Sequence, residues 1–382
     1  MNKFVSVFVV SIFLSLHYGA ILYVNSSLLG KFFSQNTTSL LFVVGALGSI
    51  VFFLFTAKLI EWFGKRLLLL FLLSIATLAT LGLAFAQTGF YVLISFIAYS
   101  SVLLTIYYCL DIFLEELSMD GNTGEIRGFH LALTNLGIAA GPITLLIFGN
   151  SDTFKHVYIV ATLLLIPPIL FAFFFLKSRM PKWHGLTHRH IFLPFGTWWR
   201  TKALRRVTLA RLMLESFFVF MVIYTPIYLH RNLGFEWSEL GIIFTIMLLP
   251  FVLLEWPAGE LADRFYGEKE IMSIGFLITA LSLVVMPFLG KVFMAWLVIL
   301  FISRVGASLI EIMTESYFFK HVGPEDTGLI SIFRLTRPVS TILGAGAGIL
   351  ALSVLSFEQV FFVLATVILF GLKISLSLKD TK

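Results

Sequence analysis

Two ionisable side chains fall deep inside apolar stretches of the sequence. If each stretch is helical, His17 and Arg304 lie roughly 20 Å and 18 Å from the first residue of the stretch, at 1.5 Å per residue. A charge at the centre of a membrane helix costs roughly 2.5–3.5 kcal/mol, so each needs a partner, a wet cavity or a function. His17 either exchanges a proton at physiological pH or forms a hydrogen bond to a neighbouring helix. Arg304 stays charged, so it attracts an anionic substrate group or holds a carboxylate.

Four carboxylates form two pairs with helical spacing. Asp111 and Glu115 are four residues apart, as are Glu311 and Glu315, so each pair shares one face of a helix. Both pairs lie toward one end of an apolar stretch. Two partly buried carboxylates on one face can carry protons near neutral pH, which makes both pairs candidates for proton coupling.

Arginines give these carboxylates a second interpretation. Arg334 and Arg337 enter their span from the same side as Glu311 and Glu315 and could neutralise them in a gate network. Charges near the membrane surface cost less than charges at mid-depth, which favours the gate over the proton carrier. Glu215 lies four residues after Arg211, so it either pairs with that arginine or belongs to the proton pathway.

The elements that must position these side chains are membrane helices. Of the 382 residues 59% are hydrophobic, only 13% are charged and 42 are Phe, and the mean hydropathy is +0.97. Water-soluble domains do not have this balance, and a spanning helix needs about 20 apolar residues. We therefore expect an all-α membrane protein with twelve transmembrane helices. The predicted spans are 4–24, 39–60, 66–86, 89–114, 127–149, 154–176, 206–230, 237–262, 271–290, 292–319, 327–352 and 357–378.

The distribution of basic residues predicts the orientation. With both termini in the cytoplasm, nineteen of the 27 Lys and Arg residues fall in inner segments, four fall in outer loops and four lie within spans. This is the positive-inside bias of polytopic proteins. It also accounts for the net charge of +6 without nucleic-acid binding, which we discard. The short loops and the small size predict a bacterial inner-membrane protein.

The longest break between spans divides the chain. Residues 177–205 contain prolines, glycines, several basic residues and the pair Trp198 and Trp199. They predict a cytoplasmic linker whose aromatic end lies in the headgroup layer. The linker separates an N-terminal six-helix bundle, residues 1–176, from a C-terminal one, residues 206–382.

The two predicted bundles resemble each other in sequence. A shift of 200 residues places Asp111, Glu115, Glu125 and Gly128 on Glu311, Glu315, Glu325 and Gly328. This agreement indicates a duplication. A parallel repeat of six spans predicts a pathway between pseudo-symmetric halves near the middle of the bilayer.

The loop between spans 8 and 9 carries a motif. It reads Gly259, Glu260, Leu261, Ala262, Asp263, Arg264, Phe265, Tyr266, Gly267, Glu268 and Lys269. This loop resembles the signature cytoplasmic loop of the major facilitator superfamily, G-x-L-A-D-R-x-G-x-K, with one extra residue before the second glycine. A glycine at a helix end permits close backbone approach, and a carboxylate can receive N–H groups from the start of a neighbouring helix. The resemblance assigns Gly259, Asp263 and Arg264 to a gate. The matching loop of the first half is degenerate, with Glu61 and Trp62 in the acidic and basic positions.

Span 5 resembles a second motif of the same superfamily. Gly128, Gly137, Gly141 and Pro142 follow the spacing G-x8-G-x3-G-P associated with antiporters, although two leucines replace its closing glycine pair. Small residues four apart also let two helices pack closely, and Pro142 bends the helix. Antiport and ordinary packing both remain open.

The resemblance implies an architecture and a mechanism. Two pseudo-symmetric six-helix bundles would rock about a central site and expose it to one side of the membrane at a time. Spans 1, 4 and 7 would line the cavity, where Tyr18, Tyr107, Tyr108 and Tyr224 would form an amphipathic wall.

We predict a secondary transporter that moves a small molecule by proton-coupled antiport or efflux. The alternatives are a proton symporter for nutrient uptake and a lipid-handling protein on the same scaffold. The expected partners are a small-molecule substrate, protons and membrane lipids, and the expected state is a monomer. The sequence shows no nucleotide-binding loop, metal-ligand cluster or nucleophile elbow. We therefore expect no cofactor, no metal and no enzymatic activity.

Overall fold

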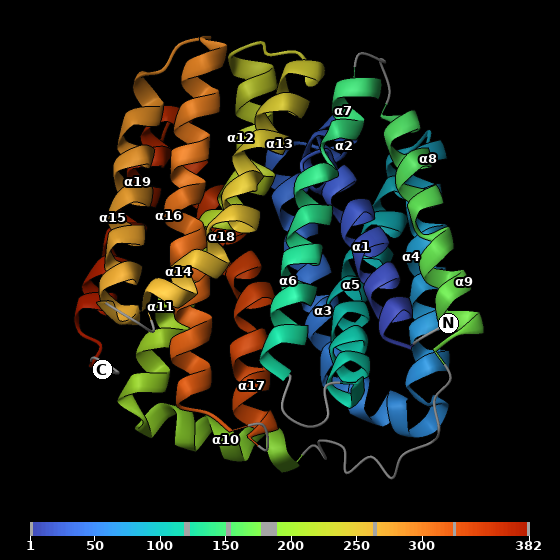
Figure 1. Ribbon diagram of the computed structural model, residues 1–382. Helices are drawn as coiled ribbons and strands as arrows, with labels where there is room; N and C mark the ends of the chain where they lie inside the picture. The colour runs from blue at the N-terminus through green and yellow to red at the C-terminus, as the bar shows by residue number, and fades with distance from the viewer. Residues whose placement is uncertain are drawn as a thin grey trace. The chain divides into compact units, whose positions relative to one another are not determined.

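The computed structural model describes residues 3–117, 123–149, 154–176, 189–262, 266–323 and 326–379. Every regular element within these residues is a helix (Figure 1). Twelve helices are long and apolar enough to cross a membrane, and each falls within four residues of a predicted span. They are Val5–Leu22, Gln35–Phe63, Lys65–Phe85, Gly89–Leu114, Phe129–Phe148, Lys155–Phe174, Lys202–Asn232, Trp237–Leu261, Glu268–Phe288, Phe293–Lys320, Gly328–Leu352 and Phe357–Leu376. The predicted all-α membrane fold is confirmed.

Contacts divide the chain into two compact units. Unit 1 comprises Met1–Gly185 and Phe235–Thr245, and unit 2 comprises Leu186–Gly234 and Ile246–Lys382. The division at residues 176 and 206 that we expect from the sequence stays a prediction.

In unit 1, α1 packs against α5, α6, α8 and α9, and α5 packs against α3 and α4. Apolar and small side chains fill these contacts, and the buried residues of α4 are mostly Leu and Ala, whereas those of α3 include Gly, Ser and Thr. The helices of this unit are α1 (Lys3–Leu22), α2 (Asn25–Phe32), α3 (Gln35–Phe63), α4 (Lys65–Phe85), α5 (Gly89–Leu117), α6 (Thr123–Ala140), α7 (Ile143–Phe148), α8 (Lys155–Leu164) and α9 (Ile166–Phe174).

In unit 2, α11 packs against α16, α18 and α19, and α15 packs against α16 and α19. The helices are α10 (Arg189–Arg200), α11 (Lys202–Ile223), α12 (Thr225–Ile227), the π-helix η1 (Tyr228–Asn232), α13 (Trp237–Leu253), α14 (Glu255–Leu261), α15 (Glu268–Val285), the 3-10 helix η3 (Met286–Phe288), α16 (Phe293–Lys320), α17 (Thr327–Arg334), α18 (Thr336–Leu352) and α19 (Phe357–Leu376). The first residues of α13, through Thr245, group with unit 1. Residues that we expect in a linker form α10, which lies across the ends of the spanning helices of unit 2 (Figure 1).

Matching turns begin the third and the ninth spanning helices. Gly64 precedes α4 with φ 76°, and Gly267 precedes α15 with φ 83°. Side chains rarely adopt this left-handed region, so both turns require glycine. The same turn at the same place in both halves supports the duplication inferred from the sequence.

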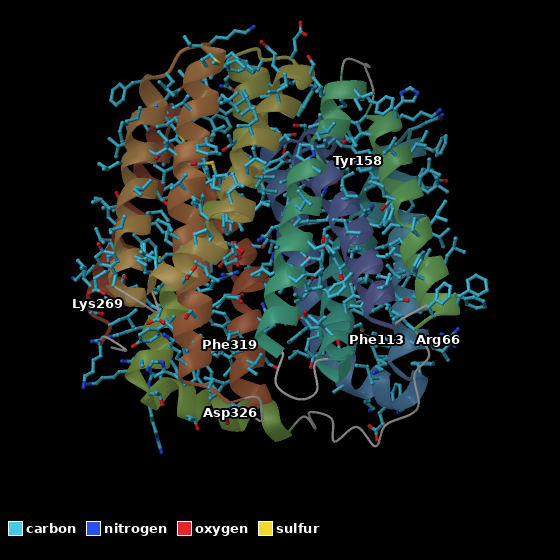
Figure 2. The ribbon with its side chains drawn as sticks, in the orientation of Figure 1. Arg66, Phe113, Tyr158, Lys269, Phe319 and Asp326 are labelled. Atoms are coloured by element: carbon cyan, nitrogen blue, oxygen red, sulfur yellow. The ribbon has the colours of Figure 1, made fainter. Side chains whose placement is uncertain are left out.

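Proline and short polar residues break several spans. α6 ends at Ala140 and α7 begins at Ile143, on either side of Pro142, because proline cannot donate the backbone hydrogen bond that continues a helix. The first span also breaks, and its continuation α2 begins at Asn25. The Tyr158 hydroxyl on α8 (Figure 2) donates a 2.7 Å hydrogen bond to Asn25 Oδ1, which ties α2 into the buried part of unit 1.

Glycines bring helices into close contact in both units. A Cβ on Gly141 would lie 2.2 Å from the carbonyl carbon of Gly19, so only glycine permits this approach of α6 to α1. In unit 2, a Cβ on Gly348 would lie 2.2 Å from the Tyr224 hydroxyl, where α18 packs against α11. The glycine pattern of span 5 therefore does pack two helices closely, and its link to antiport stays a prediction.

We expect Gly348→Ala to lower the thermal stability of the purified protein, because the buried Tyr224 ring would have to move. Gly346→Ala is the matched control on the same helix, since a Cβ there would meet no atom within 4 Å. Alanine is the better helix former by about 1 kcal/mol, so this control should be neutral or stabilising. Thermal unfolding in detergent measures both variants. Equal melting temperatures for the two would contradict the proposed contact.

Candidate functional site

An arginine shared by two carboxylates lies in the apolar interior of unit 2. Arg211 on α11 donates from Nε to Glu215 Oε1 at 3.0 Å, and from Nη2 to Glu311 Oε1 on α16 at 2.8 Å. The same Nη2 atom lies 2.9 Å from Glu215 Oε1. Charge-assisted hydrogen bonds of this length are strong, so they hold α11 against α16.

A second arginine extends this cluster to α17. Arg334 Nη1 lies 3.2 Å from Glu315 Oε1, one helical turn beyond Glu311, and Arg211 Nη1 lies 4.0 Å from the same oxygen. The Arg211 guanidinium also lies 5.9 Å from the Phe333 ring centroid. We call Arg211, Glu215, Glu311, Glu315 and Arg334 the ionic cluster. When all five groups are ionised, it holds two positive and three negative charges.

The three carboxylates of the ionic cluster differ in exposure and in partners. The Glu215 side chain is 6% exposed, whereas those of Glu311 and Glu315 are 26% and 23% exposed. Glu315 has Arg334 as a partner of its own. Among the ion pairs of the described residues, Glu311 has only Arg211, which it shares with Glu215. Glu311 is therefore partly accessible to water, and it shares its described counter-ion with another carboxylate.

Arg304 lies on α16 and is 1% exposed. Its guanidinium carbon lies 4.8 Å from the centroid of the Phe217 ring on α11, and Nη1 donates to the Ser303 hydroxyl at 3.3 Å. The aromatic face attracts the cation in a desolvated place. The two roles that we expect from the sequence, holding a carboxylate and attracting a substrate anion, stay predictions.

His17 is buried between two neighbouring helices of unit 1. Its Nδ1 lies 2.8 Å from the Ala161 carbonyl oxygen on α8, and Nε2 lies 3.1 Å from the Tyr99 hydroxyl on α5. In the neutral ring, Nδ1–H donates to the carbonyl and Nε2 accepts from the tyrosine. This is the hydrogen-bonded arrangement that we consider as one of two interpretations, and proton exchange at His17 stays a prediction.

The four candidate tyrosines have aromatic or backbone partners within their own units. The Tyr18 and Tyr107 rings meet edge to face at 6.3 Å, and Tyr108 meets Phe53 at 5.1 Å. Tyr224 is fully buried, and its hydroxyl donates to the Ala345 carbonyl at 3.2 Å. Tyr18, Tyr107 and Tyr108 are partly exposed, so they are the tyrosines that can line a cavity.

Unit 1 has no counterpart of the ionic cluster among its described residues. The 200-residue shift places Ser11 and Ser15 on Arg211 and Glu215. Ser11 Oγ forms a 2.8 Å hydrogen bond with His130 Nε2, and Asp111, the counterpart of Glu311, has no described ion pair. The duplicated scaffold therefore carries buried charge pairs in unit 2 alone, as far as the structure describes it.

Part of the predicted gate lies outside the described residues. Asp263, Arg264 and the side chain of Glu115 belong to this part. Gly259 lies on α14, where a Cβ would meet no described atom within 4 Å, so no close approach accounts for glycine there. Arg337 is exposed on α18. Beyond the loop, the buried Glu268 forms an ion pair with Lys320 and accepts a 3.1 Å hydrogen bond from the Ser316 hydroxyl.

Sequence reasoning missed the central role of Arg211. We expect Arg334 and Arg337 to neutralise the carboxylates of α16, but Glu311 pairs with Arg211, and Glu315 lies nearest to Arg334. Two pairs with helical spacing, Arg211 with Glu215 and Glu311 with Glu315, lie at similar distances from the same predicted membrane surface. This similar depth could have indicated that Arg211 meets Glu311. The spacing of residues in the sequence does not predict the contact between Arg304 and the Phe217 ring.

Twelve helices that are long and apolar enough to cross a membrane define a polytopic integral membrane protein. Residues 213–380 match the family model of the Major Facilitator Superfamily. The crystal structure of a mutant of the nucleoside transporter NupG has the same fold, with a TM-score of 0.80 over 98% of this chain and 99% of that one, at 12% sequence identity. No curated protein sequence matches this one. The chain therefore has the fold of that transporter, and its residues 213–380 are similar to the Major Facilitator Superfamily.

Proposed function

We propose that this protein is a proton-coupled antiporter that exports a small amphipathic or partly anionic molecule by alternating access. The observation that carries the proposal is the ionic cluster, which holds three carboxylates but only two guanidinium groups. An excess negative charge in a partly buried cluster costs free energy, and one bound proton removes that excess. A group that binds and releases one proton is what a proton-coupled transporter needs.

Glu311 is the proton carrier in this proposal. When it is ionised, Arg211 serves both Glu215 and Glu311. When Glu311 is protonated, Arg211 keeps Glu215 as a full counter-ion, so neither state leaves an unpaired arginine in the interior. Its partial exposure gives protons a route to water that Glu215 lacks.

Substrate binding belongs to a separate group of residues in this proposal. Arg304 would attract the anionic part of the substrate, and Tyr18, Tyr107 and Tyr108 would contact its apolar part. Because Phe217 covers Arg304 and the arginine is 1% exposed, the substrate reaches it only after Phe217 moves. Binding would therefore accompany a rearrangement of α11 against α16.

The remaining parts of the proposal concern placement. Both termini would face the cytoplasm of a bacterial inner membrane, as the distribution of Lys and Arg predicts. Asp263 and Arg264 would form the cytoplasmic gate between halves divided at 177–205, and the protein would work as a monomer.

Proteoliposomes with an imposed pH gradient and a clamped membrane potential test the coupling. A thermal-shift screen first identifies a ligand among amphipathic anions and nucleosides. Nucleosides enter the screen because the protein of similar fold is a nucleoside transporter, although 12% identity shows the fold alone. Antiport requires that protons move against the substrate, and protons that move with it would indicate symport. Saturable flux that ignores the gradient would contradict coupling of either kind.

A further inference from the structure

A stretch of the chain carries basic residues with no acidic ones. No Asp or Glu occurs from residue 153 to residue 214, while residues 177–206 contain eight Lys and Arg. Within residues 177–206, the structure describes α10 and the start of α11. Arg200, Lys202, Arg205 and Arg206 lie there within seven residues. Such a run of positive charge attracts an anionic surface.

α10 also presents an aromatic face that the described residues leave exposed. The side chains of Phe195 and Trp199 are 52% and 57% exposed. Their rings lie with that of Trp198 in one group, with centroids 5.2 Å to 6.3 Å apart. Aromatic rings of this kind are enriched at the level of lipid headgroups, where one side is apolar and the other is wet.

The aromatic face and the positive charges are held together by specific contacts. Arg205 lies 5.4 Å from the Trp199 ring centroid and donates to the Trp199 carbonyl at 3.0 Å. Trp198 Nε1 donates to the Thr208 hydroxyl on α11 at 3.0 Å. α10 also packs against α17, so it is fixed within unit 2 at both of these helices. Arg200 and Lys202 stay exposed beside this fixed face.

We propose that α10 and the first turn of α11 form a binding surface for anionic phospholipid headgroups. Arg200, Lys202 and Arg205 would contact the lipid phosphate, and Phe195 and Trp199 would enter the layer between headgroups and acyl chains. Charge complementarity selects an anionic lipid over a zwitterionic one, because residues 189–206 contain five Lys and Arg and no Asp or Glu. This inference does not depend on the proposed antiport.

A fluorescent label on α10 tests the proposal in the full-length protein. Cys109 is the only cysteine and is buried, so Thr197→Cys places a selective label on an exposed position of α10. The labelled protein is titrated in neutral detergent with short-chain phosphatidylglycerol, short-chain phosphatidylcholine and inorganic phosphate. We expect a saturable response to phosphatidylglycerol alone. An equal response to phosphatidylcholine, or to inorganic phosphate, would overturn the proposal.

Paired substitutions locate the binding surface. Each cation near an anionic surface contributes about fivefold to affinity, so Arg200→Gln with Lys202→Gln should weaken phosphatidylglycerol binding about 25-fold. Arg231→Gln with Lys291→Gln removes the same charge from the opposite predicted side and should leave the affinity unchanged. Retained melting temperatures establish that both double variants are folded. Unchanged affinity in the first pair, or equal loss in both pairs, would refute the assignment to α10.

Discussion

Replacement of Arg211 by glutamine is expected to destabilise the protein by about 3–5 kcal/mol, because it leaves the buried Glu215 carboxylate without its counter-charge. Arg211 is 8% exposed, so water cannot take over its role. Thermal unfolding of the purified protein measures the effect. The same variant should lose gradient-driven transport, since the cluster would no longer hold its charges in place.

Two further variants test whether Arg211→Gln destabilises the protein through its unpaired carboxylates or through the loss of the arginine side chain itself. Arg211→Gln combined with Glu215→Gln should recover part of the lost stability, because it removes one of the stranded carboxylates. Arg334→Gln should cost less than Arg211→Gln, since Arg334 is 36% exposed and contacts a single carboxylate. If the double variant is no more stable than Arg211→Gln, the buried charges are not the source of the effect.

Glu311→Gln is expected to abolish coupling while it preserves binding. A gradient of one pH unit is worth about 1.4 kcal/mol, which drives a tenfold concentration ratio in a one-for-one exchange. The variant should reduce that ratio to about one, because glutamine imitates the protonated carboxyl and cannot release a proton. Its amide oxygen can still accept the hydrogen bond from Arg211 Nη2, so the fold should persist.

Exchange of labelled for unlabelled substrate is the positive control for Glu311→Gln. This exchange needs no net proton movement, so we expect it to continue in the variant. Glu315→Gln is the matched control one helical turn away. Glu315 is paired with Arg334, so its neutralisation should loosen the contact with α17 while the tenfold accumulation remains. Retained accumulation in Glu311→Gln would remove this residue as the proton carrier, and the antiport proposal would then need another carboxylate.

The fold was predictable because membrane helices leave a direct record in sequence. Each spanning helix requires about 20 apolar residues, and the twelve apolar windows reproduce the twelve spans to within four residues. What sequence could not reveal was the local detail. α10 contains Pro194 and Gly196, which favour a loop, yet its aromatic residues hold a helix against α11 and α17. Asn25 reads as part of a polar loop, but Tyr158 holds it in the interior.

Side-chain pairing in the site was less predictable than the positions of the charges. The spacing of Glu311 and Glu315 places them on one face of a helix, and the structure has both in one cluster. The choice of Arg211 over Arg337 as a partner depends on which helices are neighbours and on their rotation, which periodicity does not specify. His17 shows the same limit, since its partners Ala161 and Tyr99 come from two other helices.

The pairing of Arg211 with Glu215 within one helix has a consequence for biogenesis. The ribosome makes Arg211 one hundred residues before Glu311, so we expect this arginine to enter the bilayer before its later partner exists. Glu215 is the first acidic residue after Asp152 and lies one turn from Arg211. It supplies a temporary counter-ion during insertion and lowers a penalty of about 2.5–3.5 kcal/mol per charge. We therefore expect the nascent helix to carry its own neutralising group through the translocon.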